Sequence, residues 1–476
     1  MKKYLSILMA AVLLTSMAGC AHDDPLIITE TIEGTSESVT DTPDTSAVAT
    51  APYVGSDIVS NGEGGTTHRE IKSDDSFSPA DGGTGFLEGI FGGFTDKAEE
   101  AVADDYFAYA DAVEAPTAAA GDTGGFATDI WIEPDPYIDP DYVYVEPQAG
   151  LLTGGEWNDN ENWHDWVSLY QSHEDWNEYR DLWRISFDHR ISVKVTTDDG
   201  TPVEGATVLT DEFAAVTDNN GMAYLFYDKE DAPEYVAVNY MDMETKLDGI
   251  SGDTELECSL GNLALSNEKY LDLMLMVDTT GSMSDELMYL QEELRDMVER
   301  VADENANLPI RVSVNFYRDE GDDYIVRSYP FTFELDNAVG SIMEQQAMGG
   351  GDTPEAVHTA LDVAVNEHDW DENAVKLMFL VLDAPPHEDA QIVDETNKLT
   401  AMAAAQGIRI IPVASSGIDK ATEYLLRTMA FTTGGTYTFL TDDSGIGGSH
   451  IEPTIGDYQV EKLNDMMVRI INEYLE

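Results

Sequence analysis

Apolar runs and amphipathic segments alternate along the chain from Ser266 to Glu476. The run YLDLMLMV is followed by SDELMYLQEELRDMVERV, whose apolar residues recur at the three- and four-residue spacing of one helix face. Further apolar runs are PIRVSVNFY, YIVRSYPFTF, VKLMFLVL, IRIIPVAS and TYTFL. Helical stretches are expected after Pro354, Glu388 and Ile418, and a last helix over Glu461 to Leu475. Uniformly apolar strands between helices predict a parallel sheet covered on both faces, in a doubly wound α/β domain over 266–476.

Short β segments separated by turn residues fill the preceding stretch, 186–262. They are ISVKVTT, DDGTPVEGATVLT, AAVTDNNGMAYLFY and YVAVNY, and they predict a small all-β sandwich. Asn220-Gly221 predicts a hairpin, because Gly accepts the positive φ of a tight turn. The segments PVEGATV and TDNNGMAYL resemble the carboxypeptidase regulatory-like or transthyretin-like sandwich. The resemblance implies a structural spacer without catalytic residues, and a ligand-binding sandwich is the alternative.

Tryptophan is concentrated in the segment 151–185, which contains Trp157, Trp163, Trp166, Trp176 and Trp183. Trp163 and Trp166 fit a helical stripe together with Val167 and Tyr170. Aromatic rings can stack on sugars, so a glycan platform is one interpretation of this Trp-rich helical segment. We favour the other interpretation, in which the stripe packs against a neighbouring domain, because large aromatic side chains usually contribute to packed interfaces.

The N-terminal residues 1–19 have the pattern of an export signal. Two lysines precede an apolar run that leads into Met17-Ala18-Gly19-Cys20. This segment resembles a bacterial lipoprotein signal, with Met17 where Leu is usual. The resemblance implies cleavage before Cys20, lipid attachment to its thiol, and an exported protein anchored at the extracytoplasmic face of the cell membrane. An ordinary cleaved signal with an incidental cysteine is the alternative.

Residues 20–150 are rich in Thr, Ser, Asp, Gly, Ala and Pro and show neither helical nor strand periodicity over long stretches. We expect a disordered acidic stalk that its own negative charges extend. With 24 Lys+Arg against 93 Asp+Glu, the chain has a formal net charge of −69. Such a surface repels nucleic acid and anionic lipids, so membrane contact should be limited to the lipid anchor. Apart from Cys20 the chain has only Cys258, which we expect to be a small buried side chain.

A candidate metal site begins where the run YLDLMLMV ends, at Asp278-Thr279-Thr280-Gly281-Ser282. In an open α/β sheet, ligands bind at the carboxyl ends of the strands, where several loops converge. The spacing DxTxS can offer a carboxylate from Asp278 and hydroxyl oxygens from Thr280 and Ser282 to one point. Hard oxygen donors of this kind suit Mg²⁺, with Mn²⁺ or Ca²⁺ as alternatives. Helix capping by the same residue types is the competing structural interpretation.

At these residues the chain resembles the von Willebrand factor type A (VWA) family, a Rossmann-like fold. The metal-ion-dependent adhesion site (MIDAS) of that family combines DxSxS with a Thr from a second loop and an Asp from a third. Asp278, Thr280 and Ser282 match the first element, and Asp383, directly after VKLMFLVL, matches the last. The resemblance covers 266–476 and includes FYRDEGDD, GGGDTPEAV and LDAPPH. It implies a Mg²⁺ site that binds an acidic side chain of a protein partner.

The second metal loop departs from the family pattern, because Gly351 stands where the Thr is usual and Asp352 or Thr353 must replace it. Asp278 and Asp383 already neutralise a divalent ion, so a third carboxylate would make the cluster negative and weaken its attraction for an acidic ligand. We therefore predict that Thr353, or a water held by Asp352, occupies this position.

Two further residues, Asp319 in FYRDEGDD and His387 in LDAPPH, lie near predicted strand ends. They either orient the metal ligands or cap the strands. Together the patterns predict a surface-tethered, metal-dependent adhesion module rather than an enzyme, since neither HExxH nor GxSxG occurs. A structural envelope scaffold with a vestigial metal site and a metal-dependent hydrolase are the alternatives.

Overall fold

The computed structural model describes residues 69–71, 146–229, 231–266, 268–351 and 353–476. The predictions for the signal 1–19, for Cys20, for Asp352 and for all but a few residues of the stalk 20–150 lie outside this described part. No helix in the described ranges combines the length and apolar character needed to cross a membrane.

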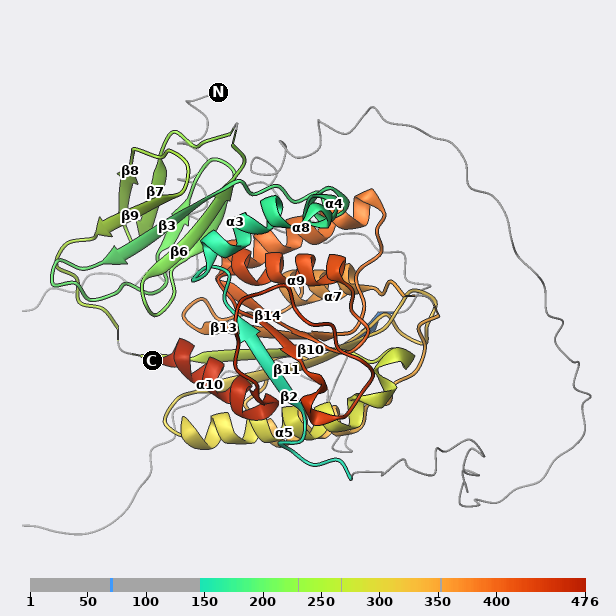
Figure 1. Ribbon diagram of the computed structural model, residues 1–476. Helices are drawn as coiled ribbons and strands as arrows, with labels where there is room; N and C mark the ends of the chain where they lie inside the picture. The colour runs from blue at the N-terminus through green and yellow to red at the C-terminus, as the bar shows by residue number, and fades with distance from the viewer. Residues whose placement is uncertain (1–68, 72–145, 230, 267, 352) are drawn as a thin grey trace, which may run out of the picture. The chain divides into compact units, whose positions relative to one another are not determined.

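A mixed sheet runs through the α/β domain, with nine strands among the described residues in the order β1-β12-β11-β10-β13-β14-β15-β2-β16 (Figure 1). Its central strands are parallel, as the sequence predicts: β10 (Leu271–Asp278), β11 (Ile310–Tyr317), β13 (Val375–Leu382), β14 (Ile408–Ala414) and β15 (Tyr437–Leu440). The outer strands pair antiparallel: β12 (Val326–Ser328), β1 (Arg69–Ile71), β2 (Thr153–Trp157) and β16 (Glu461–Lys462).

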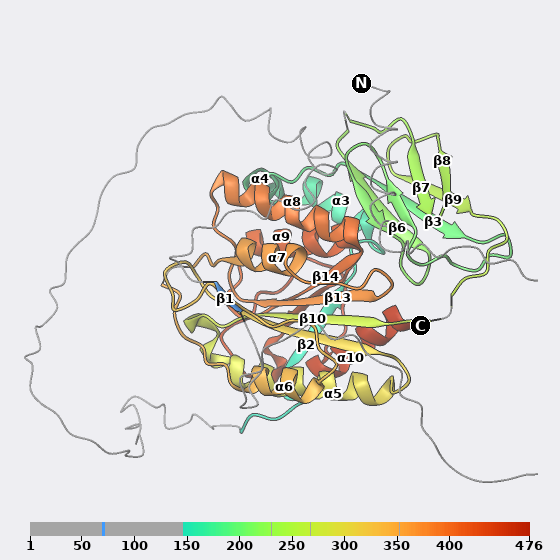
Figure 2. The same cartoon turned by 180° about the vertical axis from the view of Figure 1, so that it is seen from behind.

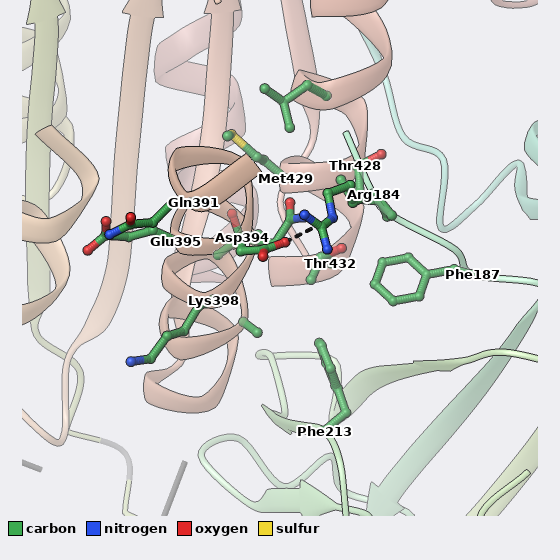
Figure 3. A pocket seen from close by; sticks show the side chains of 15 residues that line it. Arg184, Phe187, Phe213, Gln391, Asp394, Glu395, Lys398, Thr428, Met429 and Thr432 are labelled. Atoms are coloured by element: carbon green, nitrogen blue, oxygen red, sulfur yellow. Dashed lines mark ion pairs between the residues drawn. The ribbon is translucent and has the colours of Figure 1, made fainter. Parts of the chain in front are cut away.

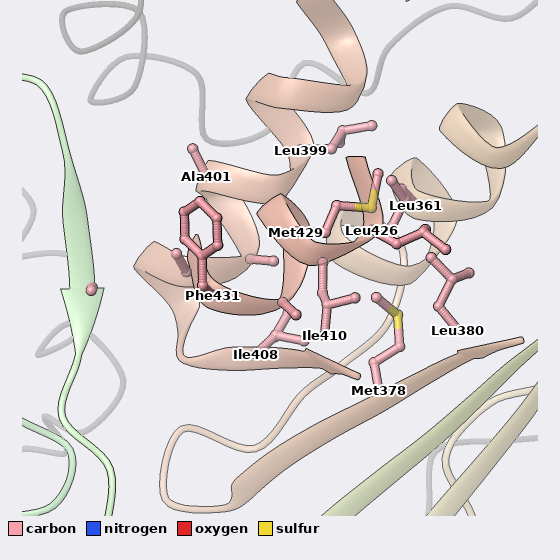
Figure 4. Packing of buried hydrophobic residues seen from close by; sticks show 14 of the residues in the cluster. Leu361, Met378, Leu380, Leu399, Ala401, Ile408, Ile410, Leu426, Met429 and Phe431 are labelled. Carbon is pink, nitrogen blue, oxygen red and sulfur yellow. The ribbon is translucent and has the colours of Figure 1, made fainter. Parts of the chain in front are cut away.

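Helices cover both faces of this sheet (Figures 1 and 2). One face carries α5 (Leu287–Glu304), α6 (Leu335–Met343) and α10 (Leu463–Leu475). The other carries α7 (Val357–Asn366), α8 (Ala390–Gln406) and α9 (Lys420–Thr433). Side chains alternate along a strand, so Met378 and Leu380 of β13 point toward Leu361 and Leu426 on α7 and α9 (Figure 4). Phe379 of the same strand lies in the core of the opposite face.

The segment before the small β region belongs to the same fold. Strand β2 pairs with β15, and α3 (Trp163–Ser172) and α4 (Glu174–Leu182) follow it. Trp166 is fully buried, with its ring centroid 5.2 Å from that of Tyr424 and 4.9 Å from that of Phe431, both on α9. The predicted packing of the tryptophan stripe is therefore confirmed, and the sheet gains a strand that the sequence pattern did not indicate.

Residues 189–259 form two small sheets that share buried residues. One contains β3 (His189–Thr196), β6 (Met222–Tyr227) and β9 (Thr254–Ser259). The other contains β4 (Thr207–Leu209), β5 (Ala214–Val216), β7 (Val236–Tyr240) and β8 (Met243–Leu247). Val193 and Leu225 of the first sheet and Val208 and Val238 of the second lie in one core cluster. Membership of a particular sandwich family stays a prediction.

The predicted hairpin at Asn220-Gly221 is wrong. The turn itself forms, with φ +70° at Gly221 and a hydrogen bond from Gly221 N to Asp218 O. The strands on its two sides nevertheless lie in different sheets, since β5 pairs with β4 and β6 with β3. One backbone hydrogen bond crosses the turn, from Asp218 N to Met222 O over 2.9 Å, and the turn also packs against β3, where Val195 N donates to Gly221 O over 2.8 Å.

The small sheets contact helices α8 and α9 around a hollow of about 340 Å³. Arg184, which has φ +53°, forms an ion pair with Asp394 of α8 over 3.2 Å. Phe187 and Phe213 lie on the other side of this hollow (Figure 3). Cys258, on β9, is a free and buried thiol, as the sequence predicts.

Candidate metal centre

The loop after β10 gathers the three residues of the DxTxS element. Asp278 is completely buried, and its Oδ1 accepts hydrogen bonds from Thr280 N over 2.8 Å and Thr280 Oγ1 over 2.7 Å. The hydroxyl oxygens of Thr280 and Ser282 are 3.1 Å apart. A short 3₁₀ helix, η1 (Gly281–Asp285), separates this loop from α5. One carboxylate and two hydroxyl groups therefore meet at the carboxyl end of a central strand.

Asp383 follows β13, the strand that pairs with β10. Burial raises the pKa of both carboxyl groups. Burial, and next the charge of Asp383, raise the pKa of Asp278 to about 7. Burial also raises the pKa of Asp383 to about 6, against a hydrogen bond from Ser282 that lowers it. The structure thus brings Asp278, Thr280, Ser282 and Asp383 together.

One carboxyl oxygen on each of three acidic side chains in this region lacks a hydrogen-bond partner among the described residues. Asp278 Oδ2, Asp383 Oδ1 and Glu355 Oε2 are all buried and unpartnered among the residues that the structure describes. Buried polar atoms are almost always satisfied, and an unpaired buried charge is costly. A cation bound between the two aspartates would satisfy both needs, so the donor set fits a hard divalent ion.

The second loop is held against the first by backbone hydrogen bonds. Met348 N donates to Thr279 O over 3.0 Å, and Gly281 N donates to Gly349 O over 3.2 Å. At Gly350, where φ is +70°, a Cβ would lie 3.0 Å from Glu355 Oε1 and 3.4 Å from Thr280 Cβ. This position therefore favours glycine, both for its conformation and for the close approach of Glu355.

Glu355 is a buried acid that the sequence patterns did not single out, whereas Thr353 is exposed. Burial, and then the charges of Asp278, Asp319 and Asp383, raise the pKa of Glu355 to about 9. Its backbone N donates to Pro385 O over 2.9 Å, which joins the second loop to the loop of Asp383. The sequence predicts a helix directly after Pro354, whereas α7 begins at Val357, so Glu355 lies in the loop before the helix and not in its first turn.

Two further contacts organise the loops. Arg318, which is buried, donates from Nε to Thr279 O over 3.2 Å and from Nη2 to Gln346 O over 2.9 Å, so it ties the first loop to the second. Asp319 Oδ1 lies 2.8 Å from His387 Nε2. Asp319 and His387 thus contact each other across neighbouring loops, while Arg318 is a positioning residue that sequence reasoning missed.

A group of three or more His, Cys, Asp or Glu side chains suited to holding a metal ion does not occur in the described ranges. The cluster at Asp278 offers two carboxylates and two hydroxyls instead, a set in which half the donors are uncharged.

The α/β domain is similar to a known protein family. Residues 272–452 match the family model described as von Willebrand factor A domain. The chain contains a VWA domain. Domains of this family are in general protein-interaction modules rather than enzymes, and the matched range includes Asp278, Glu355 and Asp383.

Two similar proteins extend the comparison. A curated relative, described as an ariadne-like RING finger protein of Acanthamoeba polyphaga mimivirus, is 34% identical over 134 residues. The match covers 27% of this chain and 12% of that relative, so the chain spans only a small part of its length. A crystal structure of the conserved hypothetical protein BatB from Bacteroides thetaiotaomicron matches with 14% identity and a TM-score of 0.30. That match covers 43% of this chain and 98% of BatB.

Proposed function

We propose that the VWA domain is a metal-dependent protein-binding module in which Asp278, Thr280, Ser282 and Asp383 hold one divalent cation, Mg²⁺ before Mn²⁺ or Ca²⁺. The observation that carries the proposal is the pair of buried carboxyl groups with unpartnered oxygens beside two hydroxyls. A bound cation would supply Lewis acidity toward an oxygen donor. The partner would be a protein that offers an acidic side chain at this edge of the sheet.

The second loop would contribute Thr353, or a water held by Asp352. Glu355 lies close to this site, and its raised pKa keeps its carboxyl group protonated and neutral near pH 7 in the cation-free protein. A neutral Glu355 leaves the two aspartates to balance the charge of the cation, and an acidic partner is still attracted. A Thr353→Val variant should weaken cation binding, whereas Glu355→Gln, which keeps shape and neutrality, should change it little.

Measuring thermal stability with and without the cation tests whether the site binds a cation, and this measurement needs no protein partner. A ligand that binds only the folded state raises stability by about 2.7 kcal/mol at 100 times its dissociation constant. Mg²⁺ should therefore raise the thermal midpoint of the wild-type protein, and Asp278→Ala should abolish this rise. Asp369→Ala, a change at an exposed acid that precedes β13, is the matched control. Equal midpoints with Mg²⁺ and with EDTA would contradict the proposal and favour a scaffold with a vestigial site.

Partner binding is tested by capture from the native envelope with Mg²⁺ or with EDTA. Proteins retained only with Mg²⁺, and lost with Asp278→Ala, are the expected result.

Tethering forms a separate part of the proposal: lipid on Cys20, an acidic stalk, and the two small sheets as a carboxypeptidase regulatory-like spacer. Metabolic labelling with a radioactive fatty acid should mark the wild-type chain and not Cys20→Ser.

A further inference from the structure

A cleft of about 640 Å³ lies away from the candidate metal centre. Four segments form it: the end of β2 with the turn that follows, the turn around Gly221 with the start of β6, Gly434 and Thr436 before β15, and the end of α10. Its volume falls in the range of about 300–1,000 Å³ that is usual for small-molecule sites. The side chain of Asn219 donates to Glu473 O over 2.6 Å, so two of the four segments are joined directly.

Aromatic rings stand in the wall of this cleft. Trp157 is the one tryptophan of the segment 151–185 that is not buried in the core. Its Nε1 donates to Asp159 Oδ1 over 3.1 Å, and a Cβ on Gly456 would lie 2.7 Å from its Cη2, so the ring is fixed in orientation. Tyr224, half-buried, also lines the cleft, with the guanidinium of Arg190 5.1 Å from its ring centroid. A fixed, partly exposed ring is suited to stacking.

Amide and carboxyl side chains supply most of the remaining wall. Asn158, Glu161 and Asn220 line the cleft, and Glu161 and Asn220 are exposed. Thr436 also lines it, and the Thr436 hydroxyl is buried without a partner among the described residues. No Lys or Arg is among the residues that line this cleft, but Arg469 forms ion pairs with two of its acids, Glu156 and Glu473, over 2.9 and 3.1 Å. Carboxylates and amides accept hydrogen bonds from hydroxyl groups, while the two remaining lining acids, Glu161 and Asp218, disfavour an anionic ligand.

We propose that this cleft binds an uncharged oligosaccharide. A sugar ring presents an apolar C–H face, which suits the ring of Trp157, and a rim of hydroxyls, which suits the planar amides and carboxylates of Asn158, Glu161 and Asn220. The site is separate from the metal centre, so it does not depend on the proposed adhesion function.

Isothermal titration of the full chain with maltotriose, cellotriose and triacetylchitotriose tests the proposal. We expect at least one of them to bind saturably, with a dissociation constant of about 1 mM or below. The double variant Glu161→Ala/Asn220→Ala should weaken that binding at least about tenfold. Trp157→Phe should also weaken it, because the stacking surface shrinks. Glu372→Ala/Asn373→Ala, the same changes at exposed positions before β13, should leave it unchanged.

Three results would overturn the proposal. One is the absence of saturable binding for all three oligosaccharides up to about 10 mM, a concentration that detects even weak sites. Another is equal binding by the wild type and the Glu161→Ala/Asn220→Ala variant, with both folded by circular dichroism. The third is binding of spermidine or Ca²⁺ at the cleft in place of any uncharged sugar. Adding EDTA should not change sugar binding, which distinguishes this site from the metal centre.

Discussion

Two regions of the α/β domain bury acidic side chains, and only one of them pairs these acids with cationic side chains among the described residues. In the first, Arg427 lies between Asp159 and Glu423, all three almost completely buried. Arg427 donates from Nε and Nη2 to the two oxygens of Asp159, over 2.9 and 2.6 Å. Its Nη1 donates to Glu423 over 3.2 Å and to Thr454 O over 2.7 Å. We call this set the Arg427 cluster.

The candidate metal centre buries Asp278, Asp383 and Glu355, and among the described residues no cationic side chain bonds to them and each has an unpartnered oxygen. The Arg427 cluster therefore has cationic partners within the fold, namely Arg427 and, for Glu423, also Lys420 over 2.8 Å. Under the proposed function, the acids of the candidate metal centre would instead be balanced by a cation from solution. The comparison predicts that the two regions respond differently to mutation, pH and added cation.

The largest effect is expected from Arg427→Met. Removing the guanidinium leaves Asp159 buried without a counter-charge, while Glu423 keeps only its ion pair with Lys420 over 2.8 Å. Breaking a buried pair in this way costs about 3–5 kcal/mol. Urea denaturation at pH 7 should show this loss. Arg427→Met with Asp159→Asn should recover part of the stability, because one uncompensated charge is gone. A loss below about 1 kcal/mol would mean that the Arg427 cluster is not a cohesive element.

The second effect concerns pH in the cation-free protein. Folded Asp278 keeps its proton up to a pKa of about 7, against an ordinary value of 3.8, so the folded state binds more protons than the unfolded state between these values. Stability from this group is thus present at low pH and lost as pH rises from about 4 to about 7, at up to about 1.4 kcal/mol per pH unit. Asp383 acts with the same sign up to about pH 6.

The measurement is the stability of the wild type minus that of Asp278→Asn, in EDTA, across this pH range. Subtraction removes the response of the other acids of the chain. The difference should fall with rising pH, and saturating Mg²⁺ should reverse the trend for the wild type alone. A difference that does not change with pH would show that Asp278 does not titrate as an unpaired buried acid.

Sequence patterns predicted the two aspartates of the candidate metal centre, because both stand at strand ends. Eight-residue apolar runs are buried on both faces, so β10 and β13 were recognisable, and Asp278 and Asp383 followed from their position after them. Glu355 was missed because its burial depends on how a glycine-rich loop folds over Thr280. Helix periodicity and strand alternation carry no information about such a loop.

The Arg427 cluster had no sequence signal of its own. Asp159 and Arg427 are 268 positions apart, and their pairing depends on β2 joining the sheet beside β15. The segment TGGEW of β2 has neither an apolar run nor an alternation, so its place is set by partners distant in the chain. Local patterns predicted the parallel centre of the sheet and could not predict its antiparallel edges.

The third effect concerns His450, a titratable side chain that pairs with two acids, Glu286 and Asp442. His450 Nε2 and Nδ1 each lie 2.9 Å from a carboxylate oxygen, of Glu286 and Asp442 respectively. Burial alone would lower the pKa of His450, but its hydrogen bonds to these two acids outweigh burial and raise the pKa above 6.5. The stabilisation is therefore complete below 6.5 and is lost as pH rises through the raised value.

The variant His450→Gln measures how much the charged His450 side chain contributes to stability. The variant should lose about 1 kcal/mol at about pH 5.5, where His450 is charged. The loss should shrink at an alkaline pH above the raised pKa of His450, where the wild-type ring has released its proton. An equal loss at both values would assign the effect to shape rather than to charge. His173→Gln, a change at an exposed histidine, is the matched control.

The smallest effect should come from a surface counterpart of Arg427. Arg300 pairs with Asp465 over 2.7 Å and with Asp296 over 3.4 Å, but about a third of its side chain is exposed. Arg300→Ala should cost less than about 1 kcal/mol, because solvent screens exposed pairs. Raising the salt concentration to about 1 M shortens the screening length to about 3 Å and should remove most of this loss. The loss from Arg427→Met should persist in the same salt, because its acids lie out of reach of mobile ions. If salt rescued both variants equally, burial would not be what separates a cohesive charge cluster from a surface one.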